Sequence, residues 1–230
     1  MRYISVPTIG GVLVVCLCFS SSTVSAAQPM QDVRSTVDGI QTIMIDARQQ
    51  PDAKKKQRVA QLKQIVSRRF DFADMAKRAL GPYWEKRSQR ERNEYVRLFT
   101  DVVQTFYLDR METYASEHTV YLRESRDGDY AEVPTKSLAV KGADLAVNYK
   151  LKRARGGDWK IYDLVIDNVS VVNNYRAQFA RVLNGGSFDQ LLVKLRDARE
   201  HQIIARKSRP DPTLLSALLL AQASSGNRPR

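Results

Sequence analysis

Residues 143–167, ADLAVNYKLKRARGGDWKIYDLVID, carry the strongest signal for the fold class of this chain. Two stretches rich in branched and aromatic residues, 143–152 and 158–167, flank the pair Gly156-Gly157. This arrangement is typical of two strands joined by a turn. Because so short a break joins neighbouring strands as a hairpin, the sequence predicts an antiparallel sheet.

Alternation within the two stretches predicts how each strand faces the core, because successive side chains of a strand point to opposite sides. In the first strand the apolar side chains share one face: Leu145, Val147, Tyr149 and Leu151. In the second strand both faces are apolar, with Trp159, Ile161 and Val165 on one and Tyr162, Leu164 and Ile166 on the other. A strand that is apolar on both faces is expected to be covered on both.

The flanking sequence supplies the remaining elements. Residues 119–124 and 130–140 predict two more strands, with turn residues at 127–129 and 141–142. Helical patterns occupy the other segments: 28–46, 53–68, a short helix opened by 70–72, 88–114, a helix that begins after Val171 and runs to Leu183, and one opened by Ser187. Val171 itself is expected to end the last strand. This order predicts an α+β domain, in which an antiparallel meander of about four strands packs against several helices.

Polar residues at the starts of these helices indicate their caps. Asp71 is the expected N-cap of the short helix, and Ser88 with Glu91 forms a capping box. A second capping box begins at Ser187. For the helix after the last strand, Asn173 and Asn174 are the candidate caps.

The helix predicted over 88–114 has more apolar residues than one core-facing stripe requires. Two explanations stay open: two separate layers cover this helix, or part of its surface lines a cavity. Asn168, just before Val-Ser, is a residue that tolerates a positive φ, as a turn there would need.

Residues 1–26 are typical of a secretory signal peptide. Arg2 is their only charge, residues 9–19 are apolar, and Val24-Ser25-Ala26 offers small residues for cleavage. The alternative is a signal anchor, but the apolar core of about 11 to 13 residues is shorter than the roughly 20 that span a bilayer. We expect a cleaved signal and export, a domain over 27–205 and a basic flexible tail over 206–230.

The positions of the cysteines and the net charge limit the kinds of site and of binding partner that the mature chain can have. Both cysteines, Cys16 and Cys18, lie inside the expected signal peptide, so the mature chain would hold no thiolate nucleophile and no zinc-thiolate site. The full chain has a formal net charge of +12. In an exported protein, this charge suits anionic lipid headgroups or acidic protein surfaces, although solubility alone also explains it.

The familiar catalytic and nucleotide-binding motifs are absent from the sequence. His118 and His201 each stand alone, and Asp127 and Asp129 fit turn chemistry. A possible carboxylate pair is Asp163 with Asp167. A buried Asp163 beside Tyr162 would favour an alternative, a small-molecule enzyme of the NTF2-like type that uses the carboxylate as a base.

Two segments carry a family resemblance. YDLVIDNVSVVNNYRAQFARVL (162–183), followed by GGSFDQLLVKL (185–195), resembles the MlaC-type periplasmic phospholipid-transport proteins, also called the toluene-tolerance family. FDFADMAKRALGPYWEKRSQRERNEYVRLF (70–99) is similar to their earlier signature. The resemblance runs from about Val33 to Leu195, and Asn168 stands where the family usually has Gly. Hopanoid-associated relatives share the Asn-Tyr-Arg signature, so a hopanoid-associated lipid-binding adaptor is a further alternative.

The resemblance implies a soluble carrier without enzymatic activity and without a cofactor. Its cargo would be phospholipid or a related lipid. Its partners would be an outer-membrane lipoprotein complex and an inner-membrane ABC transporter with a lipid-binding subunit, with no role for nucleic acid. A metal site is not expected either.

The predicted directions and the sizes of the apolar side chains indicate that acyl chains would lie between the sheet and the long helix. The candidate lipid-binding residues are Phe99, Val103, Phe106, Tyr107, Met111, Val147, Tyr149, Tyr162, Leu164, Val169 and Val171. Arg176 and Lys150 are candidates for headgroup or rim contacts, and the alternative for Arg176 is that it pairs with a carboxylate or caps a carbonyl.

Overall fold

A computed structural model describes residues 28–49, 55–114, 118–138 and 144–207. Its helices are α1 (Pro29–Gln49), α2 (Lys55–Arg69), α3 (Phe72–Leu80), a short 3₁₀ helix (Gly81–Tyr83), α4 (Gln89–Tyr114), α5 (Val171–Gly185) and α6 (Phe188–Lys207). Its strands are β1 (His118–Tyr121), β2 (Ser125–Asp127), β3 (Tyr130–Leu138), β4 (Leu145–Arg153), β5 (Trp159–Ile166) and β6 (Val169–Ser170). The expected signal peptide and residues 208–230 of the expected tail lie outside the described residues, whereas Arg206 and Lys207, which the prediction assigned to the flexible tail, belong to α6.

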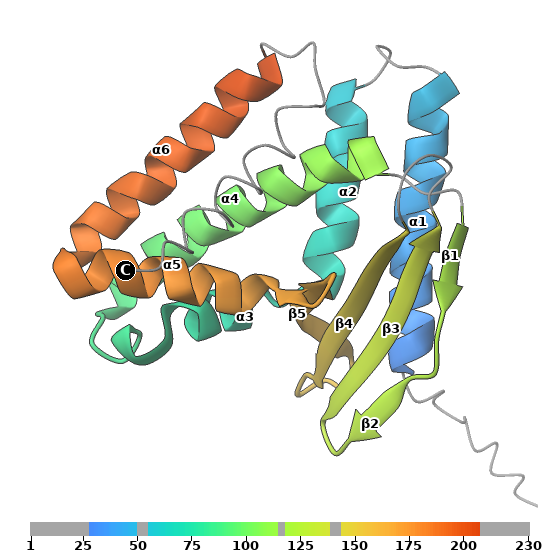
Figure 1. The fold of residues 1–230 in the computed structure, drawn as a ribbon, viewed down its shortest axis with the longest axis horizontal. Helices are drawn as coiled ribbons and strands as arrows, with labels where there is room; N and C mark the ends of the chain where they lie inside the picture. The colour runs from blue at the N-terminus through green and yellow to red at the C-terminus, as the bar shows by residue number, and fades with distance from the viewer. Residues whose placement is uncertain (1–27, 50–54, 115–117, 139–143, 208–230) are drawn as a thin grey trace, which may run out of the picture.

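The strands form one antiparallel sheet in the order β1-β3-β4-β5-β6, and β2 pairs with the other end of β3 (Figure 1). The α+β class and the antiparallel meander are therefore confirmed. The strand predicted over 119–124 is shorter than expected, and the chain after it forms β2 as a separate strand. The bridge between Phe70 and Ile161 connects the end of α2 to β5.

Strand β5 contains a β-bulge, so the side chains beyond the bulge point to the side of the sheet opposite to the one predicted. Tyr149 lies opposite Leu164 and Leu151 lies opposite Ile161, so Tyr162 and Asp163 together face Lys150. Because a bulge adds one residue, it reverses the alternation beyond it. Leu164 and Ile166 therefore share the core face with Trp159 and Ile161. The prediction that Tyr162 and Leu164 share a face, and Val165 with Ile161, is wrong.

Beyond the core face, the other side of β5 is partly covered. The guanidinium carbon of Arg78, from α3, lies 4.2 Å from the centre of the Tyr162 ring. The Asp163 carboxylate contacts the start of α5. The expected coverage of both faces is thus present, but polar contacts provide much of it on this side.

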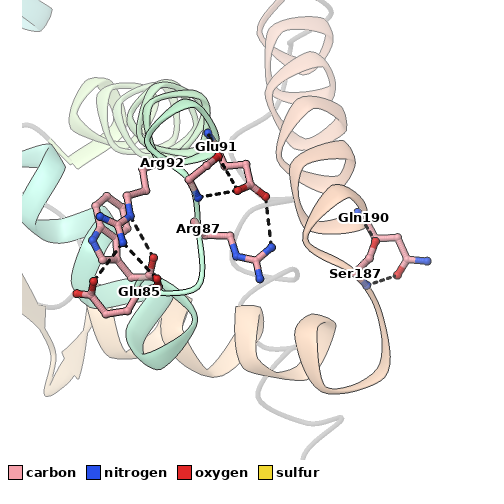
Figure 2. A network of polar contacts seen from close by, with 8 residues as sticks. Glu85, Arg87, Glu91, Arg92, Ser187 and Gln190 are labelled. Atoms are coloured by element: carbon pink, nitrogen blue, oxygen red, sulfur yellow. Dashed lines mark hydrogen bonds and ion pairs between the residues drawn. The ribbon is translucent and has the colours of Figure 1, made fainter.

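The predicted capping boxes form as expected. The Ser88 N–H donates to the Glu91 carboxylate at 2.7 Å, and Arg87 contacts the other Glu91 oxygen at 3.3 Å (Figure 2). In the second box the Ser187 N–H donates to the Gln190 side chain, and the Gln190 N–H donates back to Ser187, both at 3.2 Å. Each box satisfies backbone donors that the first turn of a helix leaves unpaired.

The start of α5 differs from the prediction. Asp167 and Asn168 have positive φ values of 45° and 65°, so the chain turns after β5 and adds the short strand β6. The expected tolerance for a positive φ at Asn168 is confirmed. The N-cap, however, is Ser170, whose hydroxyl accepts the Asn173 N–H at 3.0 Å. The predicted caps Asn173 and Asn174 lie inside the helix, and Val171 is its first residue rather than the end of a strand.

The wide apolar surface of α4 serves two regions of the core. Near its start, Tyr95 and Phe99 are buried in an aromatic cluster with Phe179 of α5 and Phe188 of α6. One turn further on, Val103 faces an interior pocket. Both explanations left open by the sequence therefore apply, each to a different part of the helix.

Candidate functional site

An apolar pocket lies where the end of α2, the start of α3 and the middle of α4 meet β5 and the first residue of α5. Its lining residues are Val66, Phe70, Phe72, Met75, Val103, Gln104, Tyr107, Leu164 and Val171. Tyr107 is the only one of these with an ionisable side chain. A pocket with this lining can hold apolar groups, but it presents no carboxylate, imidazole or amine to a bound molecule.

The Phe70-Asp71-Phe72 segment positions one wall of the pocket. The Asp71 carboxylate accepts the Asp74 N–H at 2.9 Å, as predicted, and so begins α3. The Asp71 N–H donates to the Ile161 carbonyl at 2.8 Å, which fixes the segment against β5. With the backbone held at both points, the rings of Phe70 and Phe72 stack at 5.6 Å and face the pocket.

Gln104 supplies the polar group in this apolar lining. Its side-chain amide donates to the Ser67 hydroxyl at 2.9 Å and so connects α4 to α2. The residue is only 8% exposed. A buried amide without a partner would cost free energy, so this hydrogen bond stabilises the closed arrangement of the two helices.

The pocket is small. It encloses about 20 Å³, roughly the space of one water molecule. Pockets for drug-sized ligands enclose about 300 to 1,000 Å³. A long apolar ligand therefore requires the walls of this pocket to move apart.

Four of the predicted lipid-binding residues line this pocket. Val103 and Tyr107 come from α4, Leu164 from β5 and Val171 from α5. Helix α4 thus shares one lining with β5 and the start of α5, which follow much later in the chain.

Other predicted residues lie outside the pocket lining. Phe99 is buried in the aromatic cluster. Phe106 is half-buried, and its ring meets that of the pocket residue Tyr107 edge to face at 5.1 Å. Val147 and Tyr149 are half-buried on the core face of β4, and burial raises the pKa of the Tyr149 hydroxyl to about 12. Met111 lies in α4, but its side chain is outside the described residues.

Tyr162 and Val169 lie away from the pocket lining. The Tyr162 ring is on the opposite side of the sheet, where it meets the Tyr130 ring edge to face at 5.9 Å. Val169 is 57% exposed. The bulge explains the position of Tyr162, and the turn at 167–168 explains that of Val169.

The two basic candidates make structural contacts. Arg176 donates through Nε to the Arg78 carbonyl at 2.8 Å, which is the carbonyl-capping alternative. Lys150 forms an ion pair with Glu132 at 3.3 Å across two strands. Neither residue lines the pocket.

Asp163 uses both carboxylate oxygens to hold the start of α5. One accepts the Ser170 hydroxyl at 2.6 Å and the other accepts the Val172 N–H at 3.0 Å. Asp163 is 6% exposed. Asp167 lies in the turn, where its carboxylate accepts the Ala146 N–H. This geometry gives both carboxylates structural contacts and leaves the suggested catalytic pair without support.

The prediction missed the α2–α3 side of the pocket, formed by Val66, Phe70, Phe72 and Met75. The Phe-Asp-Phe pattern indicates the start of a helix, but it does not reveal the bridge to Ile161 that holds this segment against the pocket. Within the described residues, no group of three or more potential metal ligands occurs, and no helix there is both long and apolar enough to cross a bilayer.

Several known proteins resemble this chain in sequence. The family model described as MlaC protein matches residues 34–197. The intermembrane phospholipid transport system binding protein MlaC of Haemophilus influenzae is 22% identical over 131 residues, covering 55% of this chain and 61% of that protein, less than two thirds of its length. The toluene tolerance protein ttg2D of Pseudomonas putida is 26% identical over 200 residues, covering 79% of this chain and 86% of that protein.

A solved structure shares the fold. The phospholipid-binding protein of Ralstonia solanacearum, solved in complex with a phospholipid, has a TM-score of 0.66 and 21% sequence identity to this chain. The match covers 77% of this chain and 99% of that one.

Proposed function

This chain belongs to the MlaC family, and we propose that it is a periplasmic carrier that binds a phospholipid or a related lipid. It would move this lipid between an outer-membrane lipoprotein complex and an inner-membrane ABC transporter with a lipid-binding subunit. The lipid is cargo, and the carrier needs no cofactor.

The observation that carries the proposal is the composition of the pocket. Eight of its nine lining residues are apolar or aromatic, and the ninth, Gln104, is already hydrogen-bonded to Ser67. Such a lining favours acyl chains by shape and apolarity, while a charged headgroup would remain in solvent. No proton transfer or nucleophilic attack is needed to hold and release a lipid.

Energetics explain why a lipid needs a carrier. Each CH₂ group moved from water to an apolar site gains ~0.8 kcal/mol. A two-chain lipid therefore loses on the order of 20 kcal/mol or more when it crosses water unprotected. To be loaded, a carrier has to regain nearly all of this free energy by burying the acyl chains. It must not regain much more than this, because it could then not release the lipid.

The closed pocket is the unloaded state in this proposal. Loading would separate α4 from β5 and the start of α5, with acyl chains entering between Val103 and Tyr107 on one side and Leu164 and Val171 on the other. The Gln104–Ser67 hydrogen bond connects α4 to α2 across the same region. Burial of the acyl chains against the exposed lining would offset the free energy that separating these elements costs.

Transfer between vesicles tests the proposal. Donor vesicles contain a self-quenched fluorescent phospholipid, acceptor vesicles contain none, and the purified protein is added at increasing concentration. We expect the rate of dequenching to rise in proportion to the protein concentration. A rate equal to spontaneous exchange at every protein concentration would contradict the function.

A further inference from the structure

Helix α2 has an unusual charge composition. Its sequence, KKQRVAQLKQIVSRR, contains six cationic residues and no carboxylate: Lys55, Lys56, Arg58, Lys63, Arg68 and Arg69. Helices α1, α3, α4 and α6 all contain acidic residues, and α5 has two arginines only. Among the helices that the structure describes, α2 therefore has the largest excess of positive charge.

One of these cations, Arg69, makes contacts within the protein. It forms an ion pair with Asp32 at 2.8 Å and donates to the Trp159 carbonyl at 2.9 Å. Lys55, Lys56 and Arg68 are exposed and Lys63 is half-buried. In the part of the chain that the structure describes, none of these four side chains belongs to an ion pair.

The same helix also contributes to the pocket. Leu62 and Val66 are buried, and Val66 lines the pocket. Helix α1 lies beside α2 and leaves part of its surface open to solvent (Figure 1). A surface that bound the cations of α2 would therefore lie within one helix diameter of the pocket.

The side chains of α2 also indicate the kind of partner. The large apolar side chains that are exposed on the described part of the molecule lie on other elements, and none belongs to α2. The centres of protein–protein interfaces are rich in aromatic residues and poor in lysine. A surface of lysine, arginine and neutral polar residues instead suits a dense layer of anionic headgroups, which attracts clustered cations without apolar insertion.

We propose that α2 docks on the anionic lipid surface of a membrane through Lys55, Lys56, Lys63 and Arg68. The contact is electrostatic and reversible, and it brings the α2 side of the pocket to the headgroup layer. The inference rests on the proposed function, since a lipid carrier gains from such an orientation. Its test measures membrane docking and lipid content separately.

Co-sedimentation with vesicles tests the docking. Vesicles of phosphatidylcholine with about 30% phosphatidylglycerol are compared with vesicles of phosphatidylcholine alone, at low and high salt. The wild type is expected to bind only the anionic vesicles, and mainly at low salt. The variant K55Q/K56Q/K63Q/R68Q is expected to lose on the order of 100-fold in partition coefficient, because each cation near the surface contributes.

A second variant with the same net charge separates docking from a general effect of charge. It replaces four other cations outside α2 with glutamine: Lys86, Arg90, Arg181 and Lys194. This variant is expected to bind nearly as the wild type does. Equal losses in both variants would overturn the proposal, and so would a wild type that ignores anionic vesicles, which would leave an acidic protein as the partner of α2. Phospholipid extracted from each purified variant reports on the proposed function independently.

Discussion

Replacing Val171 with aspartate is expected to remove at least about 90% of the phospholipid that co-purifies with the protein, because a carboxylate in an apolar site costs several kcal/mol. Val171 is 3% exposed and lines the pocket. It is also the first residue of α5, where the helix dipole favours a negative charge. The dipole offsets only part of the cost of burying this charge in the fold, so a urea-unfolding curve of the variant accompanies the lipid measurement. Solvent extraction and a phosphate assay per mole of protein measure the lipid.

Val169 provides the matched control, two residues away. It is 57% exposed and outside the pocket lining, so Val169→Asp is expected to retain the wild-type lipid content. Val103→Phe gives an independent test that adds no charge, since it fills the pocket at a cost of about 1 to 3 kcal/mol and should also lower the lipid content. A folded Val171→Asp protein with undiminished lipid would refute this location for the site.

Replacing Asp163 with alanine is expected to lower the free energy of unfolding by about 3 kcal/mol. The two hydrogen bonds that its carboxylate accepts, from the Ser170 hydroxyl and the Val172 N–H, are charge-assisted, and each contributes about 1.5 to 3 kcal/mol. Their loss also leaves the start of α5 without its connection to β5. Urea unfolding at neutral pH measures the change.

Asn173→Ala serves as the control for this helix start. Asn173 is exposed, and its backbone N–H rather than its side chain makes the cap contact, so its replacement is expected to change stability by less than about 0.5 kcal/mol. An Asp163→Ala protein as stable as the wild type would contradict the structural role of the carboxylate and revive its interpretation as a catalytic base.

Much of the fold could be predicted because local signals agree with the global arrangement. Gly156-Gly157 and the alternation of Leu145, Val147, Tyr149 and Leu151 indicated the hairpin and its core face. The capping boxes at Ser88 and Ser187 indicated where α4 and α6 begin. Each signal depends on residues within a few positions of one another, and so it can be read from one sequence.

The features that the sequence did not reveal depend on distant partners. No glycine or proline marks the bulge at Tyr162. The sequence of β5 therefore predicts a regular strand, and the extra residue becomes visible only in the pairing with β4. The local sequence favours Asn173 and Asn174 over Ser170 as the helix cap, because the contact that holds the Ser170 side chain comes from Asp163 on another element. Leu164 and Val171 were predicted in the pocket, but Phe70 and Phe72 were missed because the bridge to Ile161 is not visible locally.

Native mass spectrometry of the wild-type protein, purified without detergent from the cells that produce it, tests the carrier function without any substitution. We expect a species heavier than the bare chain by the mass of about one phospholipid or related lipid, which collisional activation releases and fragmentation identifies. A single species at the mass of the bare chain in repeated preparations, and after incubation with phospholipid vesicles, would contradict the assignment of this chain as a lipid carrier.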